Sequence, residues 1–287
     1  MPPYLNNGEL PTAIFCDFLN NFVHNQKGST KIRYCVHKQH ISHSFKQMSL
    51  FNSTKRSIQG YVYASKEEND LFENAKAGDL IIKKDKIPPY IVVDHSLETK
   101  IITQWPGKLF KVEVIDPANE KKLNEGLVKD VWYTRTLGVK ILEEVPIAEL
   151  FGPNGQKIEQ IIDLTRSINE SQILTLSKYD EEPNRALFAK AWRNWIMRYG
   201  KKLERSSSPI KAGLSIITSQ FDVRARALAG DSAFGIDEDG EIYLQPLWAT
   251  AVENILHAAM SYAPDDILSE FERKTMRTPF NEVFGLN

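Results

Sequence analysis

Residues 108–150 read KLFKVEVIDPANEKKLNEGLVKDVWYTRTLGVKILEEVPIAEL, and this stretch decides the fold class. It starts with an apolar, β-favouring run over 109–114, which stops at Asp116-Pro117. Apolar residues alternate again over 139–145, after a polar segment. Alternation with a period of two is typical of strands, so we expect two strands with a loop between them.

The predicted loop between these two strands is rich in carboxylates, with Asp116, Glu120, Glu125 and Asp130. Loops that follow strands frequently carry binding and catalytic groups, because the rigid sheet holds them in place. We therefore expect a catalytic acid in or near this loop.

More β-like runs precede the deciding stretch, and one amphipathic helix precedes them all. The helix is expected over 10–24, where apolar residues recur on one stripe. Short strands are expected over 31–37, 60–65, 79–82, 90–93 and 100–103. Many short strands with one helix at the start predict an α+β region that ends near Gly152.

Beyond Pro153 the apolar period changes from two to about 3.6, which is typical of helices. Helices are expected over 157–169, 185–203, 210–228 and 248–262. Between the last two, Asp239-Gly240 with isoleucines on either side predicts a β-hairpin. The sequence therefore predicts two domains, an α+β domain over 1–152 and a mainly helical domain over 153–287.

The composition is that of an ordinary globular protein. Charged residues make up 25% of the 287 residues and the net charge is -1, a balance that gives no sign of a nucleic-acid or membrane partner. Two cysteines, Cys16 and Cys35, are too few for a disulfide scaffold and fit a reduced compartment. The first residues lack the pattern of a signal peptide, and no apolar run is long enough to span a membrane. We expect a protein that works in a cytoplasm.

Three residues in the first half occur in an order known from one enzyme superfamily. His37 ends a predicted strand, Tyr63 lies within Val62-Tyr63-Ala64-Ser65, and Glu120 follows Leu109-Phe110-Lys111-Val112-Glu113. Tyr133-Thr134-Arg135-Thr136 then leads to Glu143-Glu144. Over 31–145, this arrangement resembles the ADP-ribosyltransferases, and among them the small rifampin ADP-ribosyltransferases.

The resemblance implies a split β-sheet catalytic domain that uses NAD as a co-substrate. Cleavage of the bond between nicotinamide and ribose develops an oxocarbenium ion, so negative charge beside the sugar carbon lowers the barrier. In the family, a His holds the ribose, a Tyr stacks on the nicotinamide and an acid stabilises the cation. Carried over, these roles fall to His37, Tyr63 and Glu120. Glu144 is the second choice for the acid, and Arg135 is a candidate clamp for the pyrophosphate.

Each of these residues also has a structural alternative. His37 is consistent with a surface or capping histidine, Tyr63 with cross-strand packing, and Glu120 with a solvated loop carboxylate. Lys38 stands where the family has a glycine, which favours a protein that keeps the fold without the activity. The histidines at 37, 40 and 43 lie on a strand-to-loop segment that does not hold them on one face, so no metal site is expected.

Two charge runs are expected to have structural roles. Lys83, Lys84 and Lys86 form a small basic edge, which either guards a strand against aggregation or meets a phosphate. The acids at 237–239 miss the spacing of a calcium loop and predict a turn.

The sequence thus predicts a mono-ADP-ribosyltransferase whose helical domain recognises a macromolecule. We expect a protein acceptor, as for a toxin or an effector secreted into a host cytoplasm. Two alternatives stay open: a nucleic-acid-directed member of the same superfamily, and a non-catalytic binding or regulatory protein.

Overall fold

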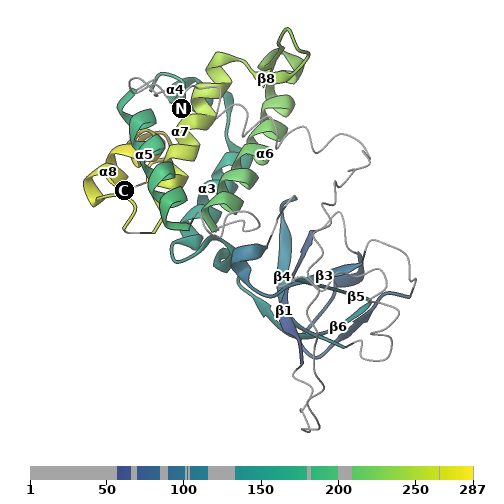
Figure 1. Cartoon of the computed structure of the whole chain (residues 1–287). Helices are drawn as coiled ribbons and strands as arrows, with labels where there is room; N and C mark the ends of the chain where they lie inside the picture. The colour runs from purple at the N-terminus through teal and green to yellow at the C-terminus, as the bar shows by residue number, and fades with distance from the viewer. Residues whose placement is uncertain are drawn as a thin grey trace, which may run out of the picture.

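The computed structural model describes most of the chain from residue 57 onward. The described residues are 57–65, 70–84, 90–100, 102, 104–115, 133–179, 182–199, 209–264 and 266–286. Within them, an antiparallel sheet is followed by a group of helices, so the predicted α+β class is confirmed (Figure 1). The predicted helix over 10–24, His37 and Glu120 lie outside the described residues.

Six strands form the sheet, in the order β2-β6-β4-β1-β3-β5, and every pair is antiparallel. Their bounds are β1 Gln59–Ser65, β2 Leu80–Ile82, β3 Ile91–Asp94, β4 Gly107–Val114, β5 Tyr133–Thr136 and β6 Gly138–Val145. Short 3-10 helices lie between some of them: η2 Asp70–Phe72, η3 Leu97–Thr99 and η4 Ile147–Phe151. The deciding stretch thus supplies β4, β5 and β6.

The sheet curls strongly, because β5 and β6 are joined by Leu137 alone. In a flat sheet of this order the two strands would lie four strand spacings apart, or about 19 Å. Two residue steps span at most about 7 Å, so the sheet must bend round until these strands meet. The hydroxyl of Thr136 fixes the corner, since it donates to the Gly138 carbonyl at 3.1 Å and accepts from the Gly138 N–H at 3.2 Å.

The two faces of the curled sheet have separate roles. Val62 on β1 pairs with Phe110 on β4, and both belong to an apolar cluster enclosed by the sheet. The other buried members of this cluster are Ala64, Phe72, Ala75, Ile91, Val93, Val112, Val139 and Ile141. Directly opposite residues project to the same side of a sheet. Tyr63, Leu109 and Val145 pair across β1, β4 and β6 and therefore share the outer face, which packs against the helices.

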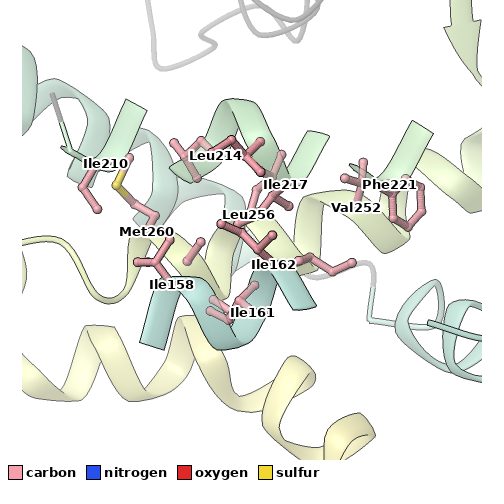
Figure 2. Packing of buried hydrophobic residues seen from close by; sticks show 14 of the residues in the cluster. Ile158, Ile161, Ile162, Ile210, Leu214, Ile217, Phe221, Val252, Leu256 and Met260 are labelled. Atoms are coloured by element: carbon pink, nitrogen blue, oxygen red, sulfur yellow. The ribbon is translucent and has the colours of Figure 1, made fainter. Parts of the chain in front are cut away.

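The helical part begins after Gly152, and two further strands interrupt it. The bounds are α3 Gly155–Ser167, α4 Glu170–Leu176, α5 Glu182–Tyr199, α6 Pro209–Ala229, η6 Gly230–Ala233, β7 Phe234–Ile236, β8 Ile242–Leu244, α7 Pro246–Met260 and α8 Glu270–Phe284. Helices α3, α6 and α7 meet in the centre of this part. Figure 2 shows the buried side chains that pack between them: Ile158, Ile161, Ile162, Ile210, Leu214, Ile217, Phe221, Val252, Leu256 and Met260.

One apolar core runs from the helices to the outer face of the sheet. It includes Leu109 and Val145 of the strands and Phe151 of η4, together with the helical residues of Figure 2. The ring of Phe151 lies 5.8 Å from the ring of Trp105, centroid to centroid. The change from strands to helices falls near Gly152, and the apolar contact continues across it.

The structure confirms most predicted elements and corrects one. Strands are present at the predicted 60–65, 79–82 and 90–93, and the predicted hairpin around Asp239-Gly240 is β7 and β8. The predicted strand over 100–103 is wrong at its described residues, because Lys100 follows η3 and neither Lys100 nor Ile102 is in a strand. Strand β5 and helices α4 and α8 were not predicted, and the stretch 108–150 contributes to three strands instead of the expected two.

Candidate functional site

Tyr63 lies on the outer face of the sheet, half-buried against the helical core. Its hydroxyl donates to the carbonyl oxygen of Gln104 at 2.7 Å. The Gln104 side chain accepts in turn from the hydroxyl of Ser65 at 2.9 Å. The ring crosses Gly107 so closely that a Cβ there would lie 2.5 Å from Tyr63 Cζ. The segment around Gln104 therefore holds the candidate nicotinamide-stacking residue at both its ring and its hydroxyl.

Glu144 is exposed and lies on the opposite face from Tyr63. It pairs with Phe110, which in turn pairs with Val62, whereas Tyr63 pairs with Leu109. Paired residues project to one side and successive residues to opposite sides. The structure therefore does not bring the second-choice acid together with the candidate stacking residue.

Arg135 lies on the same face as Tyr63, with β3 between their strands. This follows from the pairing of Asp94 with Tyr61 on one side and with Tyr133 on the other. Arg135 is exposed, and its guanidinium carbon lies 5.3 Å from the centre of the Tyr133 ring. Two strand spacings, about 10 Å, separate Arg135 from the strand of Tyr63.

A buried ion pair joins Lys100 to Asp94, which is on the strand between those of Tyr63 and Arg135. Lys100 Nζ lies 2.7 Å from Asp94 Oδ2, and the two side chains are only 8% and 10% exposed. Burial raises the pKa of the Asp94 carboxyl above its ordinary value, and the Lys100 ammonium opposes that rise. Ser96 caps η3 by accepting from the N–H of Glu98, and η3 lies in the chain between Asp94 and Lys100.

We call Tyr61, Asp94, Lys100, Tyr133 and Arg135 the Asp94 cluster. His95 lies next to it, with Nε2 2.8 Å from the Thr134 hydroxyl oxygen. The carboxylate and the ammonium satisfy each other, so the cluster presents Arg135 and the Tyr133 ring to the surroundings. A guanidinium stacked on a ring keeps its N–H donors available to a carboxylate or a phosphate.

Other titratable groups with altered pKa values lie in the helical part. Burial raises the pKa of Asp222 on α6 to about 6, and the nearby Arg226 opposes this shift. Burial lowers the pKa of His257 on α7 to about 3, and the charge of Arg185 adds to the effect. The His257 ring packs beside Phe188 at 5.1 Å between centroids. Neither Asp222 nor His257 is on the sheet, so they do not extend the Asp94 cluster.

Arg273 on α8 is the buried cation of the helical part, with 4% of its surface exposed. It donates to the carbonyl oxygens of four residues between α7 and α8, namely Ser261, Ala263, Pro264 and Leu268. These carbonyls lie at the end of one helix and in the segment that leads to the next. The side chain therefore fixes the connection between α7 and α8.

Two kinds of site are not found in the part of the chain that the structure describes. No group of three or more His, Cys, Asp or Glu residues there is placed to hold a metal ion. No helix there is long and apolar enough to cross a membrane. The histidines at 37, 40 and 43 lie outside that part.

Sequence reasoning missed the Asp94 cluster. Asp94 follows a predicted strand directly, but its partner Lys100 was assigned to the next strand. No spacing rule links these two residues, because their contact depends on the turn at η3. Comparisons of this chain with family models, with curated proteins and with solved structures gave no match.

Proposed function

We propose that the chain is a non-catalytic binding protein. The buried charged side chains support this proposal, because each is engaged in a structural contact. Asp94 and Lys100 form an ion pair, and Arg273 donates hydrogen bonds to backbone carbonyls. An NAD-cleaving site needs a carboxylate directed at the sugar carbon. Among the predicted acids, Glu144 projects from the face opposite Tyr63, which counts against such a site.

The surface that we assign to binding is the exposed part of the Asp94 cluster. Arg135 lies over the Tyr133 ring there, and the buried ion pair behind them fixes the strand that lies between β1 and β5. A guanidinium beside an aromatic ring suits an anionic group that is carried next to an apolar one. A carboxylate or phosphate on a partner molecule has this chemistry.

The test is incubation with NAD and measurement of released nicotinamide. We expect release no faster than in buffer alone, for the wild-type chain and for Tyr63→Ala. Nicotinamide release by the wild type that is lost in Tyr63→Ala would overturn the proposal.

The second candidate is the ADP-ribosyltransferase with its split β-sheet domain. The observation that favours it is the position of Tyr63 and Arg135 on one face of the sheet, where a nicotinamide and a pyrophosphate would need them. In this case the acid is Glu120, and His37 holds the ribose. Calorimetric titration with NAD, with Arg135→Ala as the weakened variant, distinguishes this candidate from a chain that does not bind NAD.

The acceptor of such a transferase is a separate question with its own measurement. Labelled NAD incubated with a cell lysate and the protein should transfer the label to a protein, which protease removes. Label that resists protease and is removed by nuclease supports the nucleic-acid-directed alternative instead. Glu120→Gln serves as the inactive control, and Glu144→Gln as the matched control on the other face.

A further inference from the structure

Strand β2 is a sheet edge with exposed apolar side chains. Among the strands that the structure describes, it pairs with β6 alone. Leu80 and Ile82 are 59% and 57% exposed. Exposed apolar residues at the edge of a sheet are a template for the addition of another strand, and proteins usually protect against this.

The surface around β2 is positively charged. Lys84 is the second residue after the strand and is exposed, and the exposed Lys140 lies opposite Leu80 on β6. Among the described residues, the neighbouring acids are Glu113, which lies opposite Lys140 on β4, and Asp79, whose carboxylate accepts the N–H of Lys76. Because Lys76 and Lys83 are also close in the chain, lysines outnumber acids among the described residues around this edge.

The hairpin of β7 and β8 has the complementary properties. Ile236 is 70% exposed and Tyr243 is 42% exposed. The turn between them contains Asp237, Glu238, Asp239 and Glu241. Asp237 is used within the turn, since it accepts from the N–H groups of Asp239 and Glu241 at 3.0 and 2.8 Å. The carboxylates of Glu238 and Asp239 remain on the exposed side of the turn.

We propose that the hairpin of one copy of this chain docks on strand β2 of a second copy. Both elements are short strands that have an edge without a described neighbour, both carry exposed apolar residues, and their charges are opposite. Opposite charge steers the encounter and fixes the register, and apolar contact supplies attraction.

The contact joins two copies, because one copy cannot make it with itself. The hairpin lies beyond the end of α6 that is farther from the sheet (Figure 1). Helix α6 has 21 residues, a length of about 31 Å at 1.5 Å per residue. Since the two surfaces differ, the contact is head-to-tail and adds copies unless the rotation closes a ring. Each strand has only three residues, so the contact is small and the association is weak.

Sedimentation velocity over a concentration series tests the proposal. We expect the average sedimentation coefficient to rise with concentration at low salt and to rise less at high salt. A basic-edge variant, Lys84→Glu with Lys140→Glu, should shift the association to at least tenfold higher concentration. A turn variant, Glu238→Lys with Asp239→Lys, should do the same. Lys157→Glu with Lys274→Glu makes the charge change of the basic-edge variant at exposed positions elsewhere and should leave the association as in the wild type.

Mixing the variants gives the sharper result. The basic-edge variant keeps an intact hairpin and the turn variant keeps an intact β2, so wild-type surfaces meet when the two are mixed. The mixture should associate at a concentration at least tenfold lower than either variant alone. A wild type that stays monomeric at every concentration, or a basic-edge variant that assembles like the control, would overturn the proposal. All substituted residues are exposed, so the variants are expected to fold.

Discussion

Replacement of Lys100 by methionine is expected to lower the free energy of unfolding by about 3–5 kcal/mol. Methionine fills the space of the lysine stem but leaves the Asp94 carboxylate without its ammonium. Because the two side chains are 8% and 10% exposed, water does little to replace the lost partner. Burial already raises the pKa of Asp94, and removal of Lys100 also removes the charge that opposes this rise.

Removal of both charges should cost much less than removal of one. In Lys100→Met with Asp94→Leu no charge remains buried, and such replacements are often close to neutral. We expect the double variant to be more stable than Lys100→Met by about 2 kcal/mol or more. With Asp94→Leu measured as the second single variant, the double-mutant cycle gives the coupling energy between the two side chains.

Urea unfolding followed by tryptophan fluorescence measures these free energies, and the chain has five tryptophans. The pH dependence gives a second check. In Lys100→Met the folded-state pKa of Asp94 is raised, so the folded state binds the proton more tightly than the unfolded state. The variant should therefore regain stability as the pH falls. A loss below about 1 kcal/mol in a folded Lys100→Met, with no dependence on pH, would refute the structural role of the ion pair.

Two further predictions concern the helical part. Asp222→Asn should stabilise the protein at pH 7 to 8 by up to about 3 kcal/mol, because burial raises the folded-state pKa of Asp222 from 3.8 to about 6 and two pKa units correspond to about 3 kcal/mol. This gain in stability should shrink as the pH falls through 6 and disappear below about 4. Urea titrations at several pH values measure it. Arg273→Met should lower the free energy of unfolding by about 3 kcal/mol or more, because it leaves four carbonyls between α7 and α8 without their donor. Thermal unfolding checks this prediction, and a variant as stable as the wild type would contradict it.

Local patterns were sufficient to predict most strands and helices of the described region. The alternation over 139–145 and the helical spacing over 248–262 depend on which face each element buries, and the structure buries Val139, Ile141, Leu256 and Met260 as these patterns imply. On the predicted helix over 185–203, Trp195 is buried and the neighbouring Ile196 is exposed.

The two missed helices had signals that periodicity does not detect. Helix α8 begins with a capping box between Ser269 and Glu272, and it ends at Gly285, whose φ of 64° suits a glycine. Pro279 inside this helix obscures the pattern, since proline usually ends a helix. Helix α4 has the same kind of start, between Asn169 and Gln172.

The sheet order and the candidate site were beyond local reasoning for a physical reason. Asp94 meets Tyr133 across a long stretch of chain, and no short window of sequence contains both. The same holds for Tyr63 and Gln104, whose hydrogen bond engages the hydroxyl of the tyrosine. The side of the sheet to which Tyr63 or Glu144 projects depends on the strand register. It can be assigned only when the neighbouring strands are known.

The single residue between β5 and β6 has a consequence for synthesis of the chain on the ribosome. Strand β2 finds its described partner only in β6, and one side of β4 also waits for β6. In a nascent chain that has emerged only as far as Leu137, β2 and one side of β4 therefore still lack their pairing strand. We expect the sheet to close in one late event, after Val145 has left the exit tunnel. A ribosome pause before Val145 emerges should therefore prolong the exposure of the apolar interior of the sheet to chaperones.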